Sequence, residues 1–293
     1  MSQGKKFKGA LSKENPLQIA GTLNACSALL AQKAGFTAIY LSGAGVSNAS
    51  FGLPDLGLTT RNDVLEDARR ITDRVDLPLL VDVDTGWGGY FNIARTVREM
   101  IRANVAAIHI EDQVDAKRCG HRPGKQLTDA ANMVDRIQAA VDARTDPHFV
   151  IMARTDALAA EGRNGATDRI LQYVGAGADM IFFEGAGSLD DYAAITKACP
   201  VPVLANITEF GVTPLFTLKE LKSAGVKMAL YPLSAFRAMN QAALTVYQTL
   251  RQRGTQESLL PAMQTREALY QLLDYHTFEK KMDEFLQKET HHE

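Results

Sequence analysis

Short apolar segments rich in β-branched residues recur along the chain, and a stretch with helical periodicity follows each of them. We count eight, at residues 17–24, 37–43, 77–86, 105–113, 148–156, 177–185, 201–208 and 226–233. The intervals contain amphipathic stretches such as NDVLEDARRITDRV and AANMVDRIQAAVDA. Strand followed by helix, eight times over, predicts an α/β fold, a (β/α)8 TIM-type barrel. A doubly wound open sheet uses the same alternation and stays the alternative fold.

Two further stretches with helical periodicity follow the eighth segment. They read SAFRAMNQAALTVYQTLRQRG and LLPAMQTREALYQLLDYHTFEKKMDEFLQ. A closed barrel does not need the second stretch, so we expect it to cover an apolar surface where two subunits meet. The predicted organisation is a single domain over residues 1–293, with the barrel at about 17–253 and a C-terminal helical extension at about 254–290.

Composition narrows the class of protein without identifying a function. The chain has 293 residues, of which 46% are hydrophobic, and a formal net charge of −2. This length allows one sizeable core, and the small charge provides no general attraction to nucleic acid or to an anionic membrane. No signal peptide or membrane-spanning run is recognisable, and three scattered cysteines do not suggest a disulfide framework. We therefore expect a cytoplasmic protein that binds neither nucleic acid nor membrane.

Polar residues gather at the predicted C-terminal ends of the strands, which is where barrel enzymes have their active sites. They are Ser42, Asp82, Asp84, Glu111, Arg154, Glu184, Asn206 and Thr208. Asp82 and Asp84 stand two apart on one predicted strand, so both side chains should point to the barrel mouth. Paired carboxylates favour Mg²⁺, or alternatively Mn²⁺, and Asp55 is a further oxygen donor. Helix caps or solvated loop acids are the structural alternative.

Several side chains in this set are suited to bind carboxylates. Arg154 can form a bidentate bond to one carboxylate, and Asn206 and Thr208 can donate hydrogen bonds to another. Arg237 and Arg266 come from the later helices and would reach the mouth if those helices fold over it. A metal and several guanidinium groups point to a polycarboxylate substrate, with phosphate as the alternative. No predicted strand ends in a lysine, which disfavours Schiff-base chemistry.

The segment KRCGHRPGK, residues 117–125, lies in the long loop after the fourth predicted strand. Loops of this length over a barrel mouth often act as lids. Cys119 stands among four cationic side chains and His121, and such charges should lower the pKa of its thiol. A thiol of this kind can donate a proton to a carbanion. The alternative is a solvated basic loop with an incidental cysteine.

Many motifs in one order carry a family resemblance. They are YLSGAG, GLPDLG, VDVDTGWG, HIEDQ, KRCGHRPGK, MARTDA, NITEFG, ALYPLSAFRAMN and MQTREALY. With them the chain resembles the isocitrate lyase and phosphoenolpyruvate mutase superfamily over nearly its whole length. Within it, KRCGH favours a carbon–carbon lyase, and HRPGK favours the type that cleaves 2-methylisocitrate to pyruvate and succinate in the methylcitrate cycle of propionate catabolism. Isocitrate cleavage, another oxo-acid reaction of this superfamily, and a non-catalytic carboxylate-binding barrel remain alternatives.

The resemblance also implies roles for individual residues. Mg²⁺ would be positioned by Asp82 and Asp84, with Asp55 nearby. The catalytic residues would be Cys119 as proton donor, His121 and Arg154, and the candidate bases are Tyr40, Glu111 or a metal-bound hydroxide. The tricarboxylate substrate would be held by Ser42, Gly43, Ala44, Cys119, Gly120, Arg154, Glu184, Asn206, Ile207, Thr208, Arg237 and Arg266. The family further implies a homo-oligomer, a tetramer built as a dimer of dimers, in which the last helices are exchanged between subunits.

Overall fold

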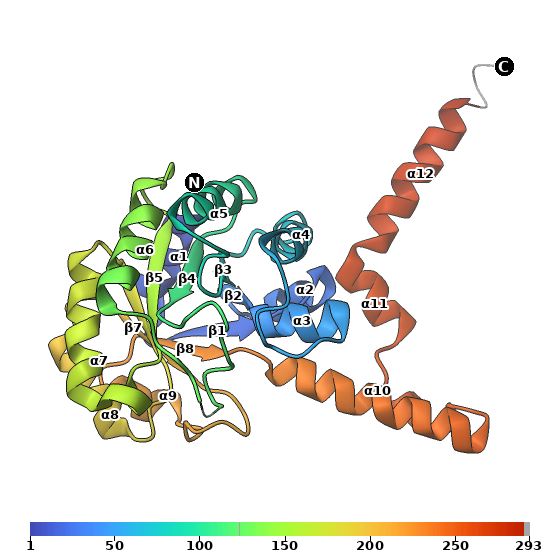
Figure 1. The fold of residues 1–293 in the computed structure, drawn as a ribbon. Helices are drawn as coiled ribbons and strands as arrows, with labels where there is room; N and C mark the ends of the chain where they lie inside the picture. The colour runs from blue at the N-terminus through green and yellow to red at the C-terminus, as the bar shows by residue number, and fades with distance from the viewer. Residues whose placement is uncertain (123, 290–293) are drawn as a thin grey trace. The chain divides into compact units, whose positions relative to one another are not determined.

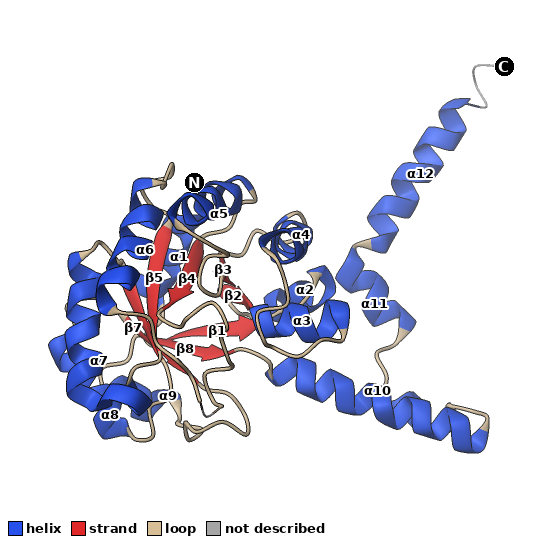
Figure 2. Cartoon of the chain, viewed as in Figure 1, coloured by secondary structure: helices blue, strands red, loops and turns tan. Residues whose placement is uncertain are grey.

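The protein contains a closed barrel of eight parallel strands in chain order (Figures 1 and 2). The structure, a computed structural model, describes residues 1–122 and 124–289. The strands are β1 (Leu17–Gly21), β2 (Ala38–Leu41), β3 (Leu79–Asp82), β4 (Ala107–Glu111), β5 (Val150–Thr155), β6 (Met180–Phe183), β7 (Val203–Asn206) and β8 (Met228–Tyr231). Each falls inside one of the eight predicted segments. The predicted (β/α)8 barrel is confirmed, and the pairing of β8 with β1 excludes the open sheet.

Helices surround the strands, as Figure 2 shows in blue and red. They are α1 (Gln3–Lys13), α2 (Ala25–Lys33), α3 (Gly43–Phe51), α4 (Arg61–Thr72), α5 (Tyr90–Arg102), α6 (Ala130–Asp142), α7 (Leu158–Gly175), α8 (Leu189–Ala198) and α9 (Leu218–Ser223). Side-chain caps fix several of their starts. For example, Ser42 accepts a hydrogen bond from the Gly45 N–H at 3.2 Å and so begins α3 directly after β2. This short connection places the N-terminus of α3 at the barrel mouth.

The strands separate two apolar cores. Ile39 and Leu41 of β2 pack outward against the helices, whereas Tyr40 between them belongs to the core inside the barrel. Phe7 of α1 also belongs to the inner core and is fully buried. Burial of a side chain of this size stabilises the fold by about 1.5–3 kcal/mol. Helix α1 therefore contributes to the core inside the barrel.

The same alternation positions the polar layer at the C-terminal strand ends. His109 and Glu111 follow the inner residue Ala107 at steps of two, and Arg154 follows Met152 in the same way. Glu184 likewise stands two residues after Phe182. The register pairs Glu111 with Arg154 across β4 and β5. The inner faces of the strands thus change from apolar to charged at the mouth.

The chain divides into two compact units, Met1–Phe236 and Arg237–Glu293. Helix α10 (Ser234–Arg253) starts at the end of the first unit, and the 3₁₀ helix η1 (Glu257–Ala262), α11 (Arg266–Leu273) and α12 (Tyr275–Glu289) follow. The last three lie in the stretch for which the extension at about 254–290 is predicted, and residue 290 lies outside the described residues. No residue of α10, η1 or α11 is buried. A single domain over the whole chain stays a prediction.

Among the described residues, no helix is long and apolar enough to span a membrane.

Candidate active site

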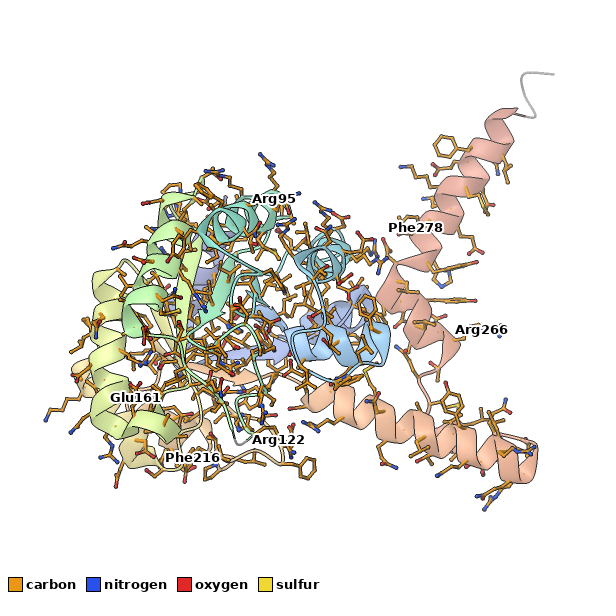
Figure 3. All side chains as sticks on the ribbon, in the orientation of Figure 1. Arg95, Arg122, Glu161, Phe216, Arg266 and Phe278 are labelled. Atoms are coloured by element: carbon orange, nitrogen blue, oxygen red, sulfur yellow. The ribbon has the colours of Figure 1, made fainter. Side chains whose placement is uncertain are left out.

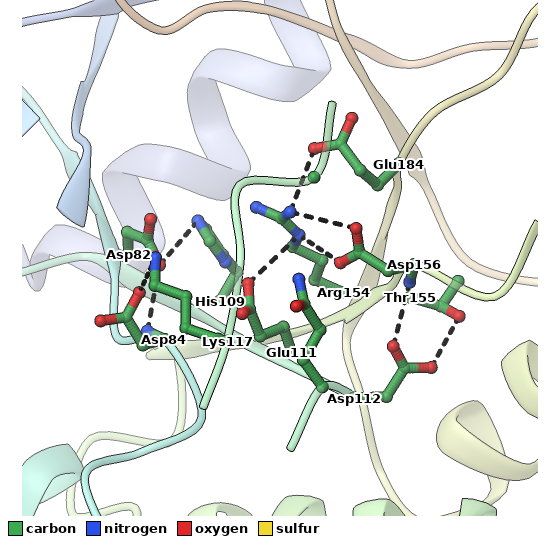
Figure 4. Close-up of polar contacts among 12 residues, drawn as sticks. Asp82, Asp84, His109, Glu111, Asp112, Lys117, Arg154, Thr155, Asp156 and Glu184 are labelled. Atoms are coloured by element: carbon green, nitrogen blue, oxygen red, sulfur yellow. Dashed lines mark hydrogen bonds and ion pairs between the residues drawn. The ribbon is translucent and has the colours of Figure 1, made fainter. Parts of the chain in front are cut away.

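Three buried carboxylates surround the guanidinium group of Arg154 (Figure 4). Its Nε lies 3.0 Å from Asp156 Oδ2 and 3.4 Å from Glu111 Oε2, and its Nη2 lies 3.3 Å from Glu184 Oε2. The sequence predicted Arg154 at the mouth but did not predict that three carboxylates surround its guanidinium group. Asp156 was missed because it follows the end of β5, although its spacing from Arg154 repeats that of Asp82 and Asp84. A substrate carboxylate would bind the N–H groups of Arg154 that these acids leave available.

Asp82 and Asp84 lie side by side, but not for the reason predicted. Strand β3 ends at Asp82, and Asp84 has a left-handed backbone with φ 47°. This turn, and not strand alternation, brings the second carboxylate back to the first. Asp82 Oδ1 accepts the Asp84 N–H at 3.0 Å, and its Oδ2 accepts the Gly43 N–H at 3.1 Å. A Cβ on Gly43 would lie 3.2 Å from Asp82 Oδ2 and 3.3 Å from Asp84 Oδ1, so glycine allows this close approach.

A cation already meets these carboxylates in the structure. The ammonium group of Lys117 lies 2.6 Å from Asp84 Oδ1 and 2.5 Å from Asp55 Oδ1. Burial alone would lower the pKa of Lys117, but Asp84, Glu111, Asp82 and Asp55 outweigh it and raise this pKa. Lys117 therefore stays charged, which argues against a Schiff-base role. The sequence placed Lys117 beside the thiol of Cys119 and missed this position.

The donor set of Asp82, Asp84 and Asp55 fits a hard divalent cation. Burial raises the pKa of Asp84 to about 6, whereas His109 and Lys117 overcome burial and lower the pKa of Asp82 to about 2. Asp84 Oδ1 lacks a well-directed hydrogen bond despite its contact with Lys117. No three His, Cys, Asp or Glu side chains of the described residues form a ready metal cage. Mg²⁺ commonly binds one or two carboxylates and keeps waters, which suits this arrangement.

Tyr40 and His109 form a neutral pair beneath the carboxylates. The Tyr40 hydroxyl lies 2.9 Å from His109 Nε2 and 3.4 Å from Asp82 Oδ2. Burial, together with Asp82, raises the pKa of Tyr40 well above 10, and burial lowers the pKa of His109 to about 4. The phenol is thus protonated, which disfavours it as a base. Burial also raises the pKa of Glu111 despite the nearby Arg154.

The loop between β4 and α6, residues 112–122 and 124–129, lies against these strand ends and is called the lid loop below. Gln113 pairs with Leu127 in an isolated antiparallel bridge, and its side chain bonds both backbone groups of Arg118 at 2.9 and 3.0 Å. His121 Nε2 lies 3.1 Å from Glu184 Oε1, and His121 Nδ1 accepts the Val212 N–H at 3.1 Å. These contacts assign the proton of a neutral His121 ring to Nε2.

Cys119 is half-buried in the lid loop, and the prediction of a lowered thiol pKa was wrong. Burial raises this pKa. Two of the four predicted cations point elsewhere: Lys117 toward Asp55 and Asp84, and Lys125 toward Asp156, 2.8 Å away. The thiol therefore stays protonated at neutral pH, which suits a proton donor.

A cavity of about 420 Å³ opens beside this thiol. Its lining residues are Pro54, Asp55, Leu56, Arg118, Cys119 and Arg122, the last of which is labelled on the lid loop in Figure 3. Cavities of this size accommodate small metabolites. Cys119 and Asp55 thus line one space at the mouth.

The remaining predicted residues divide by location. Ser42, Gly43 and Ala44 form the first turn of α3 at the mouth. The Asn206 amide donates to Glu184 Oε2 at 3.1 Å, and Thr208 is buried close by in the chain. The side chain of Ile207 packs in the outer core, so it would contribute to binding only through its backbone. Arg237 and Arg266 belong to the second unit, and their role at the mouth stays a prediction.

Comparison with known proteins identifies the family. The family model described as phosphoenolpyruvate phosphomutase matches residues 7–251. The chain belongs to this family. It is 62% identical to the 2-methylisocitrate lyase of Escherichia coli (strain K12) over 283 residues, 96% of each chain. The resemblance predicted from the motifs is therefore confirmed.

Solved structures of this superfamily share the fold. A crystal structure of 2,3-dimethylmalate lyase, a PEP mutase/isocitrate lyase superfamily member, matches with a TM-score of 0.87 and 33% identity, covering 96% of this chain and 94% of that one. Phosphonopyruvate hydrolase in complex with oxalate and Mg²⁺ matches with a TM-score of 0.85 and 27% identity, covering 98% and 100%. A structural neighbour of this chain was thus solved with the metal that the paired aspartates predict.

Proposed function

We propose that the protein cleaves the C2–C3 bond of 2-methylisocitrate and releases pyruvate and succinate. The observation that carries this proposal is the cavity that Cys119 shares with Asp55, beside the carboxylates Asp82 and Asp84. A carbon–carbon lyase needs both a site that stabilises an oxyanion and a proton donor for the carbanion. The 62% identity to the E. coli 2-methylisocitrate lyase supports this substrate.

Asp82 and Asp84, with Asp55 nearby, would hold Mg²⁺, and Mn²⁺ is the alternative. When bound, the cation stabilises the negative charge that develops on the C2 oxygen of the substrate. Lys117 now bridges Asp55 and Asp84, so its ammonium group must shift or share these carboxylates when the metal binds.

The residues of the chain then divide the proton transfers. Glu111, whose Oε2 lies 3.4 Å from Arg154 Nε, is the base that we favour for the C2 hydroxyl proton. Tyr40 is the alternative, and the raised pKa of its phenol disfavours it. As the C2–C3 bond breaks, its electron pair moves to C3 of the succinate half, and C2 becomes the carbonyl carbon of pyruvate. The S–H of Cys119 gives its proton to C3, and the resulting thiolate regains a proton from solvent.

Substrate carboxylates would bind at the first turn of α3, at Arg154 and at the pair Asn206 and Thr208. The N-terminus of a helix attracts anions because the helix dipole is positive there and its first backbone N–H groups have no partner within the helix. His121 supports this surface through Glu184, which also bonds Asn206. The lid loop would exclude water from the carbanion until Cys119 protonates it.

We also propose that the protein is a cytoplasmic homo-oligomer, a tetramer built as a dimer of dimers with exchanged C-terminal helices. The support is that α10, η1 and α11 bury no residue of their own, while Leu244, Tyr247 and Phe278 are exposed. Light scattering coupled to size exclusion tests this assembly. A monomer at micromolar concentration would contradict it.

A substrate panel tests the proposed reaction. The enzyme with Mg²⁺ is offered 2-methylisocitrate, isocitrate, 2,3-dimethylmalate, oxaloacetate and phosphonopyruvate, and products are identified by mass spectrometry. We expect the highest kcat/KM for 2-methylisocitrate. One methyl group changes binding by only about 1–3 kcal/mol, so slow cleavage of isocitrate is compatible with the proposal. Higher kcat/KM for any other member of the panel would contradict it, and binding without turnover would indicate a non-catalytic barrel.

A further inference from the structure

We propose that Lys125 and Asp156 form a latch that couples closure of the lid loop to the orientation of Arg154, a positioning role that rests on the proposed reaction. Asp156 Oδ1 accepts a hydrogen bond from Lys125 Nζ at 2.8 Å. The same carboxylate accepts from Arg154 Nε at 3.0 Å and from Arg154 Nη2 at 3.3 Å. The side chain of Asp156 is fully buried. One carboxylate therefore joins a lid cation to the arginine of the site.

Lys125 also holds the part of the lid loop that carries the thiol. Its Nζ donates to the Gly120 carbonyl oxygen at 2.6 Å, one residue from Cys119. Gly120 in turn packs on the guanidinium of Arg154, since a Cβ there would lie only 2.4 Å from Nη2. Lys125 thus ties the backbone beside Cys119 to the same group that Asp156 holds.

The Asp156 side of the latch is anchored to the barrel. Its backbone N–H donates to Asp112 Oδ1 at 2.9 Å. The other oxygen of Asp112 accepts from the Thr155 hydroxyl at 2.7 Å and from the Tyr173 hydroxyl at 2.8 Å (Figure 4 shows the Thr155 contact). Asp112 is fully buried and is used by no step of the proposed reaction. Asp156 is therefore the fixed partner, and Lys125 on the lid loop is the partner that can leave.

Charge explains why the latch should favour the closed loop. The guanidinium of Arg154 faces three acids, Asp156, Glu111 and Glu184, of which Glu184 also contacts His121. Lys125 adds a second cation at Asp156. A buried carboxylate that loses one of its cations is strongly disfavoured, so loop opening has to overcome the loss of this pair. Closure of the loop, placement of Cys119 and orientation of Arg154 then occur together.

The test compares Lys125→Met, Lys125→Arg and Asp156→Asn with the wild type. The first readout is the rate at which iodoacetamide alkylates Cys119, followed peptide by peptide because Cys26 is also exposed. The second is kcat and KM for 2-methylisocitrate. We expect iodoacetamide to alkylate Cys119 at least about tenfold faster in Lys125→Met than in the wild type. The kcat of this variant should fall by about 10- to 100-fold, with a smaller change in KM. Asp156→Asn should give the same rise in alkylation, and Lys125→Arg should restore most of both values.

The matched control is Lys6→Met, which breaks the ion pair between α1 and Asp76 before β3, at the other end of the barrel. It should leave the alkylation rate and kcat unchanged. The latch would be overturned if Cys119 of Lys125→Met were alkylated at the wild-type rate. It would also be overturned if Cys119 of Lys125→Arg were alkylated as fast as in Lys125→Met. If neither the wild type nor any variant converts 2-methylisocitrate, the proposed function fails. The comparison of alkylation rates still decides whether the latch exists.

Discussion

Replacing Gly120 by alanine adds one methyl group where the lid loop touches the barrel. The new Cβ would lie 2.4 Å from Arg154 Nη2, 2.7 Å from Glu184 Cγ and 2.8 Å from Glu184 Cδ. All three separations are far below van der Waals contact. Arg154 and Glu184 hold each other at 3.3 Å and are buried, so neither can move away freely. The lid loop must shift instead, and it carries Cys119 with it.

The expected magnitude follows from the cost of crowding a packed site. An extra methyl or methylene group in such a site costs about 1–3 kcal/mol. Gly120 does not have a left-handed backbone, so alanine adds no conformational strain to this cost. If the cost falls on the closed loop alone, kcat/KM for 2-methylisocitrate decreases by about 5- to 150-fold, because 1.36 kcal/mol corresponds to a factor of ten. Global stability should change little, since the open loop relieves the crowding.

The assay is pyruvate formation from 2-methylisocitrate, with the thermal midpoint measured in parallel. Gly9→Ala on α1 is the matched control, because a Cβ at Gly9 meets no atom within 4 Å. It should keep full activity and gain about 0.5–1 kcal/mol of stability from helix propensity. Wild-type kcat/KM in Gly120→Ala would refute the reasoning that the loop must pack on Arg154 for catalysis.

Three further predictions follow from the site. Cys119→Ser should lower kcat by about 10²–10⁴-fold in the pyruvate assay, the usual value of a general acid, and full activity would exclude the acid role. Chelation of Mg²⁺ should abolish turnover, and Asp82→Asn should weaken Mg²⁺ binding by calorimetry at least about tenfold; unchanged affinity would exclude Asp82 as a ligand. Burial lowers the pKa of His109 to about 4. Between about pH 6.5 and pH 4 the unfolded chain therefore binds more protons than the folded chain. The free energy of unfolding should fall by up to about 1.4 kcal/mol per pH unit as the pH drops through this range. Urea titrations should show a smaller slope in His109→Gln, and an identical slope would contradict the assignment.

The strands and the inward side chains were predictable because both depend on local alternation. Segments with β-branched residues identified all eight strands, and the same period of two placed Glu111 and Arg154 on the inner face. The residues just beyond the strands were harder. Asp84 reaches its partner through a left-handed turn, which strand periodicity does not describe. Strand alternation therefore predicted correctly that Asp82 and Asp84 are neighbours, but the left-handed turn at Asp84 is the cause.

Charge pairing over long sequence distances could not be predicted from the pattern. Lys117 and Lys125 were expected to act on Cys119 because they are its neighbours in the chain. In the structure they pair with Asp55, Asp84 and Asp156. The pKa of the thiol consequently changes in the opposite direction to the prediction. Partners of this kind depend on tertiary contacts, which spacing along the lid loop does not encode.

The central claim is that the C2–C3 bond of 2-methylisocitrate breaks and that the protein supplies the proton for C3. Turnover in D₂O with Mg²⁺, followed by NMR, tests the bond cleavage and tests whether C3 receives its proton from a group that exchanges with solvent, as the thiol does. We expect pyruvate and succinate in equal amounts, with one deuterium on each succinate. Pyruvate without succinate, or succinate that carries no deuterium, would contradict it.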